Sequence, residues 1–140
     1  MNVFRFHFPV TVNYGDIDAQ WHVNNKVFLT YLESARFHYI REAGLFTDRS
    51  FLELPFIVAD VHVRYLAPIE FTDEVVISVS VTKIGNKSLV MEYIVASPDG
   101  SKVYATAETV MVTFDYHTKK SVPVNAEIRR RISEYEGRAF

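Results

Sequence analysis

The fold is decided by residues 14–43, which read YGDIDAQWHVNN over 14–25 and KVFLTYLESARFHYIREA over 26–43. The first part is polar and loop-like, and its Asn24-Asn25 pair is a signal for the start of a helix. From Lys26 to about Ala43 the apolar residues share one stripe of a helix. We therefore expect a largely buried helix that a sheet wraps around and that ends at Gly44. The expected apolar stripe consists of Phe28, Leu32, Ala35 and Tyr39, widened by Leu29, Tyr31 and Ile40. The expected polar face is narrow and consists of Glu33, Arg36, Arg41 and Glu42.

Strands are expected on both sides of this helix. Residues 4–12 alternate apolar and polar side chains with the period of a half-buried strand, and Pro9 favours an edge position because proline has no N–H to donate. After the helix, segments rich in Val and Ile are separated by turn signals at residues 85–86 and 97–100. The expected strands are 56–66, 75–84, 87–96 and 101–116, followed by a helix over 126–136 with Asn125 as its N-cap.

This order of elements predicts an α+β fold in which an antiparallel sheet packs against one long helix. The later strands carry apolar residues on both faces, since Val76, Val90 and Ile94 lie opposite the main apolar rows. One helix covers only one face of a sheet. We therefore expect a second subunit to cover the other face or a sheet edge.

The composition excludes several classes of protein. The chain has 140 residues, enough for one domain, and a net charge of −2 with interleaved charges, which does not predict nucleic-acid binding. It has no cysteine, so disulfides, thiolate metal sites and a cysteine nucleophile are excluded. No apolar run approaches the ~20 residues that cross a bilayer, and the N-terminus alternates, so we expect a cytoplasmic protein with no membrane partner. The histidines are scattered without His-Glu-x-x-His spacing, so no metal site is expected.

The densest group of reactive side chains precedes the helix and consists of Asp16, Asp18, His22, Asn24 and Asn25. A helix N-terminus presents unpaired N–H groups and a partial positive charge, which polarise a carbonyl and hold an oxyanion. A carboxylate a few residues upstream is placed to attack that carbonyl or to activate water. The spacing does not separate Asp16 from Asp18, and an aspartate in such a loop is more often a turn former or a cap.

This region resembles the 4-hydroxybenzoyl-CoA thioesterase family of hotdog proteins. The resemblance rests on the Tyr-Gly-Asp-Ile-Asp run at 14–18, the His-Val-Asn-Asn run at 22–25, and a helix that carries Tyr31 and Glu33-Ser34-Ala35-Arg36. It extends along the chain because the strand order also matches. The run Tyr65-Leu66-Ala67-Pro68 resembles the end of the family's second strand.

The resemblance implies a single hotdog domain over residues 1–140, with a five-stranded antiparallel sheet wrapped around the long helix. Two subunits are expected to join sheets edge to edge in a homodimer, and many relatives pair further into a homotetramer. Asp18 matches the family's catalytic carboxylate, which acts as nucleophile or general base on the thioester. Backbone N–H groups near Val23 to Lys26 are expected to polarise the thioester carbonyl.

Other positions are carried over one by one. His22 matches a family histidine, and Asn25 and Glu33 are further catalytic candidates; the alternative for Glu33 is an ordinary charge on the polar face of the helix. Gln20 departs from the asparagine of related enzymes, and Trp21 stands where many relatives have glycine, which is expected to affect the acyl slot. Contacts with the CoA nucleotide are expected from Lys87, Ser88, Lys119 and Lys120, and the alternative for each lysine is a solvated turn residue.

The function implied by the resemblance is hydrolysis of a fatty or aromatic acyl-CoA to the free acid and CoA. The expected partner is an acyl-CoA or an acyl carrier protein thioester, and no separate cofactor is expected because CoA is part of the substrate. Two alternatives stay open, because a fold does not fix a function. They are a non-catalytic acyl-CoA binding module and an acyl-CoA hydratase or dehydratase on the same fold.

Overall fold

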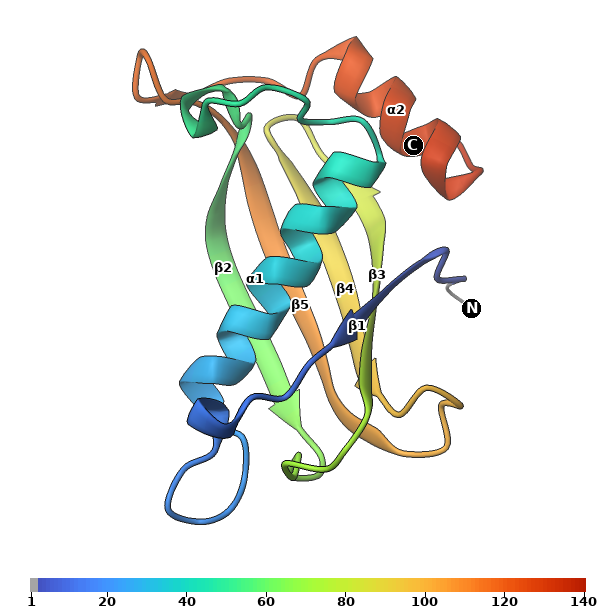
Figure 1. Cartoon of the computed structure of the whole chain (residues 1–140). Coiled ribbons are helices and arrows are strands. Elements are labelled where there is room, and N and C mark those ends of the chain that lie inside the picture. Colours follow the sequence, from blue (N-terminus) through green and yellow to red (C-terminus); the bar gives the residue numbers. More distant parts are fainter. Residues whose placement is uncertain (1–2) are drawn as a thin grey trace.

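A curled antiparallel sheet and one long helix make up most of the chain (Figure 1). The computed structural model describes residues 3–140, so the first two residues of the expected domain lie outside the described part. The helices are α1 (Asn25–Glu42) and α2 (Ala126–Glu136), with short 3-10 turns at η1 (Tyr14–Asp16) and η2 (Phe51–Glu53). The strands are β1 (Phe6–Val10), β2 (Phe56–Tyr65), β3 (Val75–Ile84), β4 (Ser88–Ala96), β5 (Val103–Asp115) and β6 (Lys120–Ser121).

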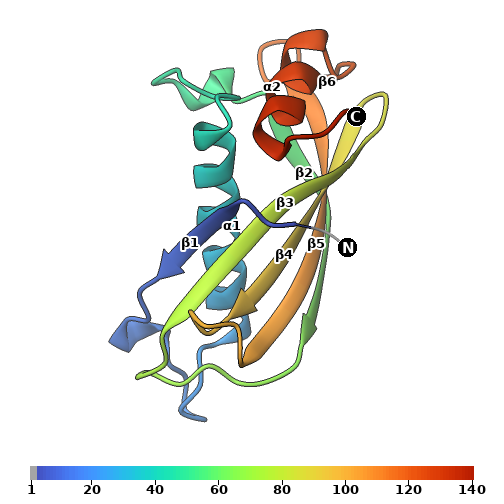
Figure 2. The same cartoon turned by 90° about the vertical axis from the view of Figure 1, so that its right-hand side faces the viewer.

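The strand order in the sheet is β1-β3-β4-β5-β2, and every neighbouring pair is antiparallel. The five expected strands and the terminal helix are confirmed, and Pro9 lies in edge strand β1 as predicted. The sequence missed β6, because its two residues, paired with the end of β5, are too short to show a period. Register shifts in three strand pairs add local twist, and the sheet curls around α1 (Figure 2).

Helix α1 lies along one face of the sheet, as its apolar stripe predicts (Figure 1). The side chain of Asn24 accepts a hydrogen bond from the Lys26 N–H at 3.0 Å, and Gly44 adopts a φ of +77° after the helix ends. Two positions differ from the prediction. Leu29 is 45% exposed, because nothing in the described chain covers that side of α1. Arg36 is buried and not on the polar face, since its guanidinium interacts with the hydroxyl of Tyr93 inside the sheet.

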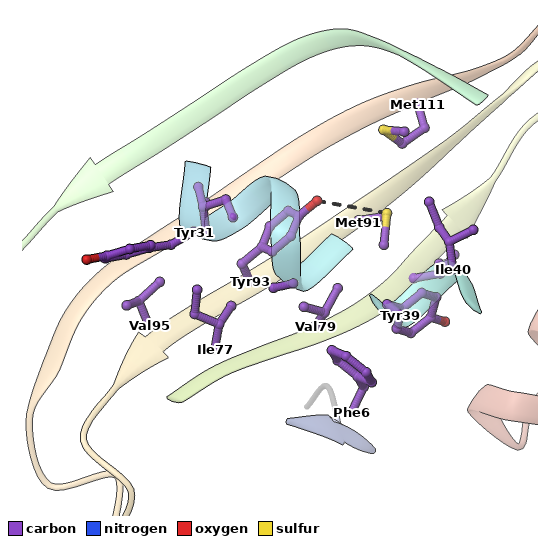
Figure 3. Packing of buried hydrophobic residues seen from close by; sticks show 14 of the residues in the cluster. Phe6, Tyr31, Tyr39, Ile40, Ile77, Val79, Met91, Tyr93, Val95 and Met111 are labelled. Atoms are coloured by element: carbon purple, nitrogen blue, oxygen red, sulfur yellow. Dashed lines mark hydrogen bonds between the residues drawn. The ribbon is translucent and has the colours of Figure 1, made fainter. Parts of the chain in front are cut away.

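The core lies between α1 and the inner face of the sheet, where alternate residues of β3, β4 and β5 point (Figure 3). Tyr93 and Thr109 place two hydroxyl groups in this layer. The Tyr93 hydroxyl hydrogen-bonds the Thr109 hydroxyl at 2.8 Å and lies 3.9 Å from the Met91 sulfur. Burial raises the pKa of Tyr93, so the ring stays neutral and adds both apolar area and one satisfied polar group to the core.

The buried carboxylate of Glu136 ties the end of α2 to α1 and β3. It accepts hydrogen bonds from the Tyr39 hydroxyl at 2.5 Å, the Val81 N–H at 3.0 Å and the Ser80 hydroxyl at 3.0 Å. Strand β1 stops pairing with β3 at Val79, so the Val81 N–H would otherwise face an open sheet edge. The C-terminal end of α2 therefore closes the part of the β3 edge that β1 leaves free.

Replacing Glu136 by Ala removes three hydrogen bonds from a buried site. We expect the free energy of unfolding in urea to fall by about 2–4 kcal/mol, because buried donors are left without an acceptor. Glu134→Ala is the matched control on the same helix, since its exposed ion pair with Arg130 contributes little. Equal urea midpoints for the two variants would show that the buried network does not hold α2 in place.

Candidate active site

A tight hairpin carries Asp18 immediately before α1. Ile17 and Val23 form an isolated antiparallel bridge at its base, and the Asp18 N–H donates to the His22 carbonyl at 2.9 Å. The Trp21 N–H donates back to the Asp18 carbonyl at 3.0 Å and closes the turn. The hairpin projects beyond the end of the sheet, next to the first turn of α1 (Figure 1).

The Asp18 carboxylate has one oxygen engaged and one available. Its Oδ1 accepts a hydrogen bond from the Gln20 N–H at 2.9 Å, which orients the side chain within the hairpin. Within residues 3–140 the carboxylate accepts no other hydrogen bond and has no ion-pair partner. A half-buried carboxylate with a free oxygen is positioned for attack on a substrate atom or for proton abstraction from water.

Asp16, in contrast, is held by several hydrogen bonds within the fold. Its Oδ2 accepts hydrogen bonds from the Asn13 N–H at 2.9 Å and the Tyr31 hydroxyl at 2.5 Å, and its carbonyl accepts from the Asn24 N–H at 3.0 Å. Burial, and then this hydrogen bond, raise the pKa of Tyr31 well above its usual value. Asp16 therefore fastens the loop to α1. The two acids, which the spacing left level, have different surroundings.

The first turn of α1 presents unpaired backbone donors toward this loop. The N–H groups of Val23 and Lys26 are taken by the Ile69 carbonyl at 2.8 Å and the Asn24 side chain at 3.0 Å. Among the described residues, the N–H groups of Asn25 and Val27 have no acceptor. Of the oxyanion donors expected near Val23 to Lys26, only the Asn25 N–H is therefore free among the described residues, and the free N–H of Val27 follows two residues later.

A cavity of about 570 Å3 brings three predicted catalytic residues together, namely Asp18, His22 and Asn25. The opposite wall is the segment that leaves β2, including the Tyr65-Leu66-Ala67-Pro68 run singled out from the sequence. The remaining lining residues are Gln20, Val23, Asn24, Phe28 and Ile69. The sequence pointed to both walls but gave no reason for them to meet. The hydrogen bond from the Val23 N–H to the Ile69 carbonyl joins them directly.

Glu33 lies outside this cavity. It is exposed, stands 3.9 Å from Arg36, and lines a second groove of about 720 Å3 between α1, η2 and the start of β2. The groove is largely apolar, and Phe51 and Leu52 are more than half exposed along it. The sequence gave no signal for this groove because its walls come from three separate segments.

The four residues expected to contact CoA lie at the other end of the sheet from Asp18. Ser88 pairs with Val112 and Lys120 with Asp115, near the Phe56 end of β2, whereas the Asp18 cavity lies at the Tyr65 end. Strand β2 has ten residues, so the two ends are roughly 30 Å apart. Within one chain, Lys87, Ser88, Lys119 and Lys120 therefore do not share a site with Asp18.

Within residues 3–140, no three His, Cys, Asp or Glu side chains are grouped so that they would hold a metal ion. No helix in the described chain is long and apolar enough to span a bilayer.

Comparison with known proteins identifies the family. A model described as the thioesterase-like superfamily matches residues 12–132, and the chain belongs to this superfamily. The long-chain acyl-CoA thioesterase FadM of Escherichia coli K12 is 24% identical over 118 residues, which cover 84% of this chain and 89% of FadM. These matches confirm the resemblance drawn from the sequence.

Solved structures agree with the fold. A thioesterase of Thermus thermophilus in complex with coenzyme A and zinc superposes with a TM-score of 0.87 at 35% identity, over the full length of both chains. A 4-hydroxybenzoyl-CoA thioesterase variant in complex with 4-hydroxybenzoyl-CoA gives a TM-score of 0.83 at 16% identity, covering 91% of this chain and 98% of that one. The curled sheet around one long helix is therefore the hotdog architecture.

The different surroundings of the two acids predict that disturbing the Asp16 contact lowers stability and that replacing Asp18 does not. Tyr31→Phe removes a hydrogen bond to a carboxylate and should lower the free energy of unfolding by about 1–2 kcal/mol. Asp18→Asn should unfold like the wild type, because the amide oxygen of Asn still accepts from the Gln20 N–H. Urea unfolding of both variants measures this. A larger loss for Asp18→Asn than for Tyr31→Phe would contradict the assignment.

Proposed function

We propose that this chain hydrolyses acyl-CoA thioesters and that Asp18 performs the chemistry. The observation that carries the proposal is the cavity that both Asp18 and Asn25 line, since Asp18 has an oxygen without a hydrogen bond and Asn25 has an N–H without an acceptor among the described residues. An acyl-transfer site needs these two groups, a nucleophile or base and a donor for the oxyanion. Membership of the thioesterase-like superfamily supports the same reaction class.

The thioester carbonyl oxygen would accept a hydrogen bond from the Asn25 N–H, where the helix dipole also favours negative charge. On one route Asp18 attacks the carbonyl carbon and expels CoA as a thiolate, and water then hydrolyses the resulting mixed anhydride to the free acid and the regenerated carboxylate. On the other route Asp18 takes a proton from the water that attacks the carbonyl carbon, and the tetrahedral intermediate collapses directly to the free acid and CoA thiolate. His22 lies in the same cavity and is available for a proton on either route. CoA is part of the substrate, so the scheme requires no separate cofactor.

We infer a homodimer through the free edge of β2. Within residues 3–140, β2 pairs with β5 on one side and with no strand on the other, and Val58, Val61 and Tyr65 of β2 are exposed. An unprotected apolar edge strand favours pairing with another chain. Antiparallel pairing of two β2 strands about a two-fold axis would bury this row and continue the sheet across both subunits.

Such a dimer explains why one chain holds only half of the expected site. Antiparallel pairing sets the Tyr65 end of one β2 beside the Phe56 end of the other. The Asp18 cavity of one subunit then adjoins the apolar groove of its partner, together with Lys87, Lys119 and Lys120 of the partner subunit. The groove suits an acyl group and the lysines suit CoA phosphates, which they bind as point charges.

Three finer points stay predictions. A tetramer is expected from the resemblance. Its second interface would cover Val76, Val90 and Ile94, which are half-buried on the convex face of the sheet. Glu33 would reach substrate from the groove of the partner subunit. A cytoplasmic location follows from the composition of the sequence.

Asp18→Asn tests the chemistry. In a thiol-release assay across short, long, branched and aromatic acyl-CoAs, we expect kcat/KM on the best substrate to fall by about 10²-fold or more, because the carboxylate is the nucleophile or base. Wild-type kcat/KM in this variant would exclude the role of Asp18.

The same assay separates the two alternative functions. A hydratase or dehydratase would change the enoyl absorbance without releasing thiol, and a binding module would bind the acyl-CoA without any turnover.

Mixed dimers test the shared site. We expect one intact site, with wild-type KM and half of wild-type kcat, in a dimer of one Asp18→Asn chain and one chain carrying Lys87→Ala, Lys119→Ala and Lys120→Ala. The reason is that the chain with intact Asp18 faces the intact lysines of its partner. Differently tagged, co-expressed chains allow purification of this species, with the homodimer of the triple variant as control. A raised KM equal to that control would mean that each Asp18 uses lysines of its own chain.

A further inference from the structure

Trp21 has a backbone conformation that its side chain disfavours. Its φ is +69°, in the left-handed region where a Cβ atom meets the backbone and glycine is preferred. The turn from Asp18 to His22 requires this conformation, because the Trp21 N–H bonds the Asp18 carbonyl. Trp21 is nevertheless 81% exposed, so the described part of the chain offers its side chain little packing that would offset the strain. Strain kept without local compensation at the mouth of a site suggests a role in binding.

The position of Trp21 in the hairpin indicates what it would bind. Its chain neighbours Gln20 and His22 line the Asp18 cavity, whereas Trp21 does not. The hairpin itself projects past the end of the sheet (Figure 1). The indole therefore stands outside the cavity in which the thioester carbonyl would react. In the dimer proposed above, the apolar groove and the phosphate-binding lysines of the partner subunit adjoin this cavity. With the acyl group in that groove and the phosphates on those lysines, the carrier portion would leave the cavity past this ring.

We propose that Trp21 stacks on the adenine ring of coenzyme A and makes the enzyme selective for CoA over carriers that lack a nucleotide. The proposal rests on the proposed acyl-CoA hydrolysis. Adenine is the one flat aromatic group of the carrier, and base stacking on an exposed tryptophan is a common source of nucleotide affinity. An acyl carrier protein presents its acyl group on phosphopantetheine without adenine, so the indole gains nothing from it.

Trp21 is the only tryptophan of the chain, so its fluorescence reports on the proposed contact directly. In the ligand-free protein the emission maximum should match that of an indole in water. Titration with CoA should quench the emission, and titration with pantetheine should not. An emission maximum already shifted to the blue without ligand would mean that a partner subunit covers the ring, and would overturn the proposal. Absence of quenching by CoA would overturn it as well.

Kinetics of Trp21→Gly and Trp21→Phe give the second test. For an acyl-CoA, Trp21→Gly should raise KM by about 10-fold with kcat nearly unchanged, and Trp21→Phe should retain most of the affinity. For the same acyl group on pantetheine, all three proteins should have equal kcat/KM. Equal losses on both substrates would mean that the ring acts by shaping the Asp18 hairpin, which would contradict nucleotide stacking.

The melting temperature provides the control for folding. Trp21→Gly should melt at the same or a higher temperature than wild type, because glycine relieves the strain at this φ. A lower melting temperature would show that the indole packs on protein, and would overturn the proposal. If wild-type protein released no thiol from any acyl-CoA, the proposed hydrolysis would fail, whereas quenching by CoA would still support the contact between Trp21 and the nucleotide.

Discussion

The site depends on the hydrogen bond from the Tyr31 hydroxyl to the Asp16 carboxylate, 2.5 Å long. Tyr31 belongs to the buried face of α1, so this bond anchors the preceding loop to the helix that packs on the sheet. The Asp16 carbonyl in turn accepts from the N–H of Asn24, the N-cap residue, and this bond fastens the start of α1 to the loop. Asp18, two residues after Asp16, lines the same cavity as the free N–H of Asn25, and its carboxylate accepts no hydrogen bond from that helix turn. In the proposed mechanism, Asp16 positions the loop and Asp18 performs the chemistry, although the two acids look equivalent in the sequence.

The two edges of the sheet differ in how their backbone is covered, and the uncovered edge is the one through which we propose that two subunits pair. At the β1 side, the Glu136 carboxylate and the end of α2 take up the backbone that β1 leaves free. At the β2 side, the described chain offers no cover, and apolar side chains stay exposed along the strand. One edge is closed within the subunit and the other is open to a partner. The same open edge adjoins both the Asp18 cavity and the apolar groove.

Much of the fold follows from local pattern. The alternation of residues 4–12, the apolar stripe after Asn25 and the turn signals between later strands gave the correct elements, because periods of two and 3.6 depend on near neighbours. Errors arose where the surroundings decide. Leu29 belongs to the apolar stripe but faces no part of its own chain, and Arg36 has a charge but reaches a buried tyrosine. Periodicity predicts which face of a helix or strand carries a side chain, but it does not predict which residues pack against that face.

The sequence by itself determined the α+β layout, the loop before α1 as the reactive region and, through the register of its motif, Asp18 as the carboxylate of interest. Only the tertiary structure showed how the surroundings of the two acids differ, because Asp16 accepts a hydrogen bond from Tyr31 of α1 whereas Asp18 keeps a free oxygen. It also put Glu33 in another groove and the expected CoA-binding lysines at the far end of the sheet. Strand order decides which ends of the sheet meet, and strand order is set by pairing between segments far apart in the chain, which local pattern does not encode.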